Sequence, residues 1–287
     1  MMWMAKFPFE LNINLIAIDE AIKGFSKQFS GFFGVIKNIL NGLINGILTV
    51  LNFIPWWLLI ILVVLGGWKF TGRKIKGVIY GIMLFFIGLT GLWELMNETL
   101  SVVLAAVVIS LLIGFPLGIF LAGNESINRI ARPILDTMQT MPVFVYLIPA
   151  VLFFGLGKAP AVIATTIYAI VPMIRLTSLG IRQVDKEVVE AARAFGSTKF
   201  QALWKVQIPQ ALPTIMTGVN QTLMMAMAMV VTCSMIGVSG LGMEVLNGVN
   251  RIEIARGLRA GIAVVIVAVI MDRLTQGWIN KSEVNKK

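Results

Sequence analysis

The stretch Arg175 to Pro209, RLTSLGIRQVDKEVVEAARAFGSTKFQALWKVQIP, is a long polar interruption in a mostly apolar chain. It contains Glu190-Ala191-Ala192, then Gly196, and it ends in Val206-Gln207-Ile208-Pro209. Lys, Arg, Asp and Glu cluster there with Ala and Phe, whereas the segments on either side are hydrophobic. In a membrane protein, one amphipathic segment of this length on a single side of the bilayer predicts a surface that binds a partner.

The composition indicates an all-α integral membrane protein. Of the 287 residues, 57% are hydrophobic and 13% are charged, and the mean hydropathy is +0.87. Soluble domains carry about 25% charged residues. The net charge of +10 is typical of basic cytoplasmic loops rather than of a nucleic-acid-binding protein.

Several site types are excluded by residue usage. The chain has no histidine and one cysteine, Cys233, which excludes a disulfide framework and a Cys/His metal site. Gly67 to Lys74 (GWKFTGRK) has Arg73 where a phosphate-binding loop needs lysine, so no ATP site is expected there. Glu10 and Asp19 interrupt the N-terminal region, so no cleaved signal peptide is expected.

Hydropathy predicts seven transmembrane segments, since a span needs about 20 apolar residues. They cover residues 51–69, 77–96, 100–122, 135–155, 159–178, 212–236 and 258–275. Pro142 and Pro149 are predicted to break or kink the fourth segment. The ends hold charged residues, but the centres look uncharged, which disfavours an ion-coupled carrier because such carriers place Asp, Glu or His within the membrane.

The distribution of basic residues predicts the orientation. The loops 69–76, 123–134 and 175–209 together with the tail from 273 hold sixteen Lys and Arg, and the opposite side holds eight. The positive-inside rule therefore places the polar stretch and the C-terminus in the cytoplasm and the N-terminus outside.

An amphipathic helix is predicted ahead of the first span. Its apolar face comprises Phe33, Ile36, Leu40, Leu43, Ile47 and Leu51. Its polar face comprises Lys37, Asn38, Asn41, Asn45, Thr49 and Asn52. Such a helix lies along the membrane surface, either as a simple anchor or as a scaffold around the spans or a brace for an outer partner.

The polar stretch predicts two short helices joined at a glycine corner. Lys186 to Phe195 forms the first helix, Gly196 suits a left-handed C-cap, and Ser197 is expected to cap the second helix. The second helix is expected to run to about Val206 and to stop at Ile208-Pro209. Residue spacing alone fits a hairpin that docks a partner and an ordinary cytoplasmic helical hairpin equally well.

The pattern Glu190-Ala191-Ala192-x3-Gly196-x9-Val206-x-Ile208-Pro209 resembles the EAA motif of ABC importer permeases. Gln139 to Ala150 (QTMPVFVYLIPA), Gly155 to Gly157 and Ile236 to Gly242 (IGVSGLG) resemble the glycine betaine/proline betaine permeases of that type. The likeness covers residues 95–278. Val206 and Ile208 depart from the commoner Ile and Leu.

The resemblance implies a type I ABC importer permease core with cytoplasmic coupling helices, working as a homodimer with two cytoplasmic ABC ATPase subunits and an external substrate-binding protein. This chain would have no catalytic residue and would bind no cofactor or metal, since ATP and Mg²⁺ belong to the ATPase. It would lie in the inner membrane in contact with lipid. The coupling residues would be Glu190, Ala191, Ala192, Phe195, Gly196, Ile208 and Pro209.

The expected organisation has four parts. Residues 1–50 form an external segment with the amphipathic helix, 51–96 two accessory spans, 97–278 the permease core with the EAA loop at 179–209, and 279–287 a cytoplasmic tail. Candidate path residues are Met141, Pro142, Tyr146, Met224 and Met227. Importers of methionine, taurine or nitrate, and an ion-coupled secondary transporter, are the alternative functions.

Overall fold

The computed structural model describes residues 15–284, and within them the regular elements are all helices. The parts of the predicted N-terminal segment and tail that fall on residues 1–14 and 285–287 lie outside the described residues. The helices are α1 (Leu15–Gln28), α2 (Ser30–Phe53), α3 (Trp56–Thr71), α4 (Lys74–Leu89), α5 (Trp93–Gly123), α6 (Glu125–Thr140), α7 (Val143–Phe154), α8 (Lys158–Arg182), α9 (Lys186–Ala194), α10 (Lys199–Ala202), the π-helical turn η2 (Leu203–Gln207), α11 (Ile208–Ala228), α12 (Val230–Ser234), α13 (Leu241–Asn250) and α14 (Ile254–Val284).

Within residues 15–284, five helical segments are long and apolar enough to cross a membrane. They are α2, α5, α8, the continuous helical run 199–234 and the 254–279 part of α14. The pair α6 and α7 would make a sixth span if counted together, although the two helices meet at 91°. The apolar helix α3 is shorter, at 16 residues. The multi-pass character is confirmed, whereas the count of seven is not.

The predicted spans 77–96 and 135–155 are each divided between two helices in the structure. The segment 77–96 was expected to be one helix, but α4 ends at Leu89 and α5 begins at Trp93, with Gly91 between them at φ +70°. The segment 135–155 is divided between α6 and α7 at Met141-Pro142. The expected break at Pro142 is thus confirmed, since Pro142 sits at the N-cap of α7 where its missing N–H costs nothing. Pro149 lies inside α7.

The core is built where small residues let helices approach closely. On α5, a Cβ added at Gly118 would lie 2.5 Å from the Thr177 Cβ of α8. A Cβ at Gly114 would lie 3.0 Å from Ile170 of the same helix. Such glycines allow membrane helices to pack backbone to backbone, and α8 is mostly buried between α5 and α11.

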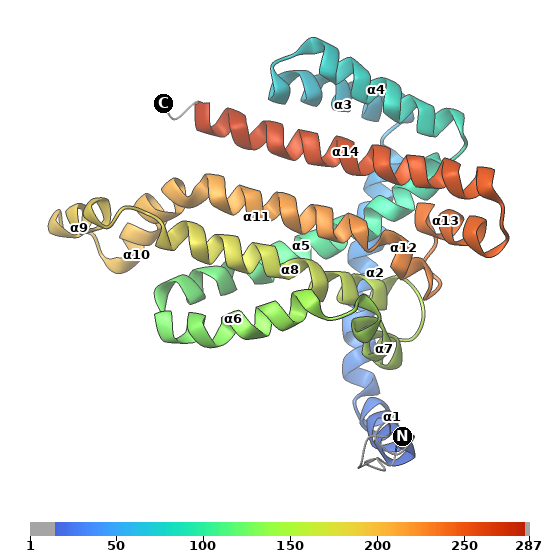
Figure 1. The fold of residues 1–287 in the computed structure, drawn as a ribbon, viewed down its shortest axis with the longest axis horizontal. Coiled ribbons are helices and arrows are strands. Elements are labelled where there is room, and N and C mark those ends of the chain that lie inside the picture. The colour runs from blue at the N-terminus through green and yellow to red at the C-terminus, as the bar shows by residue number, and fades with distance from the viewer. Residues whose placement is uncertain (1–14, 285–287) are drawn as a thin grey trace, which may run out of the picture.

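The long helices lie roughly side by side. Figure 1 shows α5, α8, α11 and α14 running along the long axis of the molecule, with α9 and α10 at one end and α7 and α13 at the other. The C-terminal end of α14 lies toward the α9 end. The predicted amphipathic helix forms as α2, which buries Leu40 and Ile44 and runs crosswise to the long helices.

Candidate functional site

The polar stretch forms a helical hairpin of α9 and α10 that projects beyond α8 and α11 (Figure 1). The Asp185 side chain caps α9 by accepting a hydrogen bond of 2.9 Å from the Glu187 backbone N–H. Gly196 has φ +85°, and the Ser197 N–H donates to the Ala192 carbonyl at 3.1 Å. This is the left-handed helix ending that glycine favours, so the expected glycine corner is confirmed.

The cap of the second helix is one residue later than expected. Thr198, not Ser197, is the N-cap residue of α10. Its hydroxyl accepts a hydrogen bond from the Gln201 N–H at 3.3 Å, and the Gln201 side chain accepts one from the Thr198 N–H at 2.9 Å. This reciprocal capping box satisfies two backbone donors, whereas a serine cap at 197 would satisfy one.

Ile208-Pro209 does not stop the second helix, contrary to expectation. The helical run continues from Lys199 to Ser234, and the π-helical turn η2 lies directly before Pro209. In this turn the Ile208 N–H donates to the Leu203 carbonyl, five residues back. A proline lacks the N–H and clashes with the carbonyl four residues earlier, and a wider turn accommodates it without ending the helix.

The hairpin and the turn η2 that follows it expose three aromatic side chains. Phe195 is 92% exposed and Phe200 68% exposed, and Trp204 is also exposed. The Phe200 and Trp204 rings lie 6.0 Å apart. We call Phe195, Phe200 and Trp204 the aromatic patch. Contiguous exposed apolar groups are typical of protein–protein or membrane contact sites.

The structure separates the predicted coupling residues into two groups. Glu190, Ala191 and Gly196 are exposed on the hairpin beside Phe195, and Ala192 is half-buried. Ile208 and Pro209 belong to α11 instead, where Ile208 packs against the small cluster of Met173, Ile181, Ala211 and Ile215. That cluster joins the ends of α8 and α11 from which the hairpin projects. Sequence reasoning missed Phe200 and Trp204, although their spacing of four residues on a helix signals a shared face.

Helix α6 carries a polar surface that is separate from the hairpin. Its residues Arg129, Arg132, Asp136, Thr137, Gln139 and Thr140 are exposed. Residues 123–134 were expected to form a loop, but they form most of a helix that packs along α5 and α8. The low hydropathy of this segment concealed it from a search for apolar spans.

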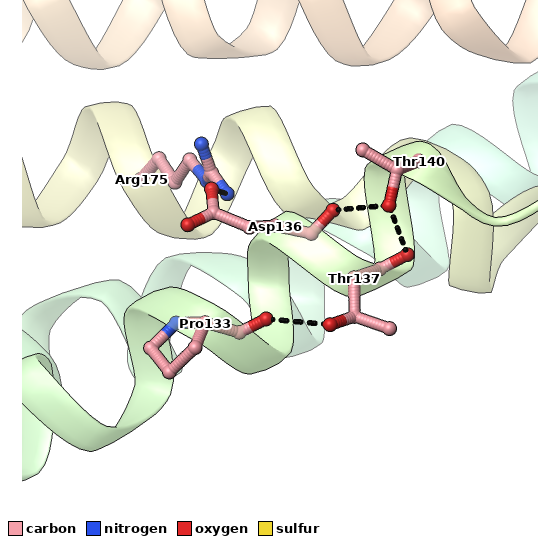
Figure 2. A network of polar contacts seen from close by, with 5 residues as sticks. All are labelled: Pro133, Asp136, Thr137, Thr140 and Arg175. Carbon is pink, nitrogen blue, oxygen red and sulfur yellow. Dashed lines mark hydrogen bonds and ion pairs between the residues drawn. The ribbon is translucent and has the colours of Figure 1, made fainter.

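The α6 surface contains an ion pair between helices. Arg175 of α8 donates to the Asp136 carboxylate, as Figure 2 shows. The Thr140 hydroxyl is 3.2 Å from the Asp136 carbonyl oxygen, and the Thr137 hydroxyl is 2.8 Å from the Pro133 carbonyl oxygen. These local hydrogen bonds satisfy hydroxyls on the C-terminal half of α6. Nearer the α9 end of α8, Arg182 pairs with Glu125 at 3.3 Å.

One carboxylate within a predicted span was not singled out from the sequence. Asp272 of α14 accepts hydrogen bonds from the Asn220 side chain of α11 at 2.9 Å and from Gln276 at 2.7 Å. The Arg273 Nε lies 3.8 Å from the Asp272 Oδ2. A carboxylate held by two amide side chains is a satisfied polar contact between α11 and α14.

The candidate path residues occupy different environments. Met141 is half-buried and Pro142 exposed at the break between α6 and α7, and Tyr146 is 7% exposed within α7. On α11, Met224 is exposed whereas Met227 is 3% exposed in the core beside α5 and α14. The five residues thus do not form one surface of the single chain. Among the described residues there is no cluster of three His, Cys, Asp or Glu side chains suited to a metal ion.

The chain is similar to known proteins, both over its helical core and over most of its length. A family model described as "Binding-protein-dependent transport system inner membrane component" matches residues 114–281. The chain is 49% identical to the glycine betaine/carnitine transport permease protein GbuB of Listeria monocytogenes, over 93% of this chain and 95% of that protein. It is 43% identical to the glycine betaine/proline betaine transport system permease protein ProW of Escherichia coli, over 94% of this chain and 77% of that protein.

A solved structure shares the fold. The inward-facing MetNI methionine ABC transporter matches with a TM-score of 0.59 at 21% identity, over 68% of this chain and 95% of the matched chain. At that identity, the likeness is one of fold.

Proposed function

Because the chain belongs to the family of inner membrane components of binding-protein-dependent transport systems, we propose that it forms the membrane path of an ATP-driven importer of glycine betaine or a related compatible solute. The chain is a multi-pass permease of the ABC transporter type. The choice of solute is supported by the relatives that are named for glycine betaine.

The α9–α10 hairpin is the proposed docking site for the ATPase. The observation that carries this proposal is the aromatic patch, with Phe195 92% exposed beside Glu190 and the glycine corner. Burial of this patch against a groove of the ATPase would transmit the movement of the ATPase dimer to α8 and α11, between which the hairpin is fixed. ATP and Mg²⁺ would be held by the ATPase, and this chain would contribute no catalytic group, cofactor or metal ligand.

The proposed assembly contains two copies of this chain, two ATPase subunits and an external substrate-binding protein. An exposed polar face on helices that run through a membrane cannot face lipid at low cost. The α6 face and the exposed Thr217 and Gln221 of α11 therefore favour contact with a second copy or with a water-filled path. Met141 and Pro142 border this surface, and they remain candidate path residues with Tyr146, Met224 and Met227.

The proposed topology has the hairpin and the C-terminus in the cytoplasm, the N-terminus outside, and α2 on the outer membrane surface. The basic residues of the loops support the orientation, and α2 runs crosswise to the spans near the end that carries α7 and α13 (Figure 1). On this view α2 does not cross the membrane, and α6 and α7 together make one span. With α3 and α4 as the two accessory spans, the count is seven. The division into residues 1–50, 51–96, 97–278 and 279–287 belongs to the same proposal.

Loss of the Phe195 ring tests the docking site. Phe195→Ala should weaken binding of the ATPase subunit by about 30-fold, since a buried aromatic anchor contributes about 2 kcal/mol or more to an interface. Binding is measured with the purified full-length permease in nanodiscs. Phe32→Ala is the matched control, because Phe32 is 61% exposed on α2, which lies near the end of the molecule that carries α7 and α13. Equal binding by both variants would remove the hairpin as the docking site.

Competition tests the solute. Uptake of labelled glycine betaine by the reconstituted complex should be inhibited by excess unlabelled glycine betaine and not by methionine, taurine or nitrate. Inhibition by one of those three solutes alone would assign the permease to that solute.

A further inference from the structure

A cavity lies where α2, α3, α4 and α5 meet, away from the α9–α10 hairpin. Its volume is about 730 Å³, and it is enclosed by the C-terminal end of α2, the start of α3, the end of α4 and the first turns of α5. Ligand pockets have volumes of about 300 to 1,000 Å³. The proposed transport mechanism makes no use of this cavity.

The cavity wall combines aromatic rings with carboxylates. Trp56, Phe85 and Trp93 contribute rings, and Glu94 and Glu98 contribute carboxyl groups one helical turn apart on α5. Trp56 and Phe85 lie 6.4 Å apart, centroid to centroid. Aromatic faces and carboxylates both attract cations, and carboxylates repel anions.

Polar groups in the wall lack partners. Asn97 is 2% exposed and donates to the Asn52 side chain at 2.9 Å, but its own Oδ1 has no hydrogen-bond partner. Glu98 Oε2 also has no hydrogen-bond partner, and Lys158 is 3.9 Å from it. No ion pair to Glu94 is present in the described part of the chain. Buried acceptors without donors are costly, so a donor cation in the cavity would stabilise them.

An apolar groove adjoins the cavity. It has a volume of about 400 Å³ along α3 and α4, and it shares Trp56, Ile60 and Phe85 with the cavity. Trp57, Ile61, Val64, Val78 and Ile82 line its remainder. The start of α3 lies where the two meet, and its N-cap residue Pro55 provides no side-chain cap. The first backbone N–H groups of α3 are therefore available to a phosphate.

From this juxtaposition we infer that the cavity and groove hold one phospholipid with an ammonium head group. The ammonium lies between the rings and the carboxylates of Glu94 and Glu98, the phosphate at the start of α3, and an acyl chain in the groove between α3 and α4. Such a lipid joins the accessory helices α3 and α4 to the core helix α5. The inference is independent of the transported solute.

Lipid retention by the purified full-length protein tests the inference. Native mass spectrometry compares phosphatidylethanolamine with phosphatidylglycerol, which shares the phosphate and the acyl chains but has no ammonium. We expect one phosphatidylethanolamine to be retained per chain in preference to phosphatidylglycerol. The double variant Glu94→Gln/Glu98→Gln should reduce this retention at least about tenfold, since it removes both charges facing the ammonium.

A control variant, a check of folding and an aromatic variant complete the test. Glu20→Gln is the control, because Glu20 is an exposed carboxylate on α1, and it should leave retention unchanged. Melting temperatures of all variants establish that they are folded, and Trp93→Leu removes a ring without changing charge and should also reduce retention. Equal retention of the two lipids, or retention unaffected by the double variant, would overturn the inference. Displacement of the lipid by tetramethylammonium at low concentration would assign the cavity to a free cation and overturn the lipid.

Discussion

At the scale of single residues, the corner of the hairpin depends on Gly196 and the start of α10 depends on Thr198. Gly196 was expected to adopt a left-handed conformation and does so at φ +85°. Such a position depends on the residue itself and its immediate neighbours, which the sequence contains. Thr198 was missed as a cap, because Ser197 and Thr198 are both good N-caps and only the pairing with Gln201 distinguishes them.

A second residue-level feature is the pairing of Glu244 with Arg256, which fixes α13 to α14. The Arg256 guanidinium donates to both carboxylate oxygens, at 2.7 and 2.9 Å. These hydrogen bonds, more than any other cause, lower the pKa of Glu244 below its usual value, although burial opposes them. The charged carboxylate is thus favoured in the folded protein, and its contribution to stability is present above the pKa of the unfolded chain and is lost as the pH falls through the lowered folded value.

Glu244→Gln should therefore lower the melting temperature at neutral pH. The difference from the wild-type protein should shrink as the solution is acidified, because the wild-type carboxyl then becomes protonated too. Thermal unfolding of both proteins over a pH series in detergent measures this. Glu253→Gln is the comparison, since Glu253 contacts the same guanidinium through one hydrogen bond of 3.1 Å and its side chain is 45% exposed. A difference that grows at acid pH would contradict the assignment.

At the scale of elements, the sequence predicted the long apolar helices and the two short helices of the hairpin, but not the full length of the polar helix α6. The predicted spans 159–178 and 258–275 correspond to α8 and α14, each extended at both ends. Residues 125–134 of α6 were expected to be a loop, because they are polar and the local sequence does not show what they pack against. The turn between α4 and α5 was missed because Thr90 and Gly91 interrupt an apolar run too briefly to alter its mean hydropathy.

The crossing of α5 and α8 gives an element-scale prediction. Gly118→Ala should lower the free energy of unfolding by about 1 to 3 kcal/mol, the usual cost of overpacking a close contact. The added Cβ would lie 2.5 Å from the Thr177 Cβ and 2.9 Å from the Ile174 carbonyl oxygen. Gly123→Ala on the same helix is the control, since a Cβ there meets nothing within 4 Å. Denaturation in detergent compares the two, and equal stability would show that the helices do not approach as described.

At the scale of the whole molecule, tertiary contacts lay beyond what the sequence provides. Helix α2 runs crosswise to the long helices, and the Asn220 side chain donates a hydrogen bond to Asp272. Both features bring together segments that are far apart in the chain. Hydropathy and charge nevertheless predicted the membrane class, and motif resemblance predicted the permease family. The proposed orientation depends on basic residues that cluster in alternate loops.

Labelling from each side of the membrane tests that orientation. In a Cys233→Ser background, Ser197→Cys in the hairpin should react with a membrane-impermeant maleimide only from the cytoplasmic side. Ser239→Cys, between α12 and α13, should react only from outside. Both positions follow helices that end at opposite ends of the molecule (Figure 1). Reaction of both cysteines from the same side would contradict the topology.

The energy source of uptake tests the central claim most directly. Labelled glycine betaine uptake is measured in vesicles containing the permease, the ATPase and the binding protein, with ATP supplied on the cytoplasmic face. An ion-coupled carrier would draw on the membrane potential, which supplies about 2.3 kcal/mol per charge at 100 mV. We predict that uptake persists when ionophores dissipate all ion gradients and stops when the ATPase subunit is omitted. Uptake by this chain alone, driven by a sodium or proton gradient, would contradict the account.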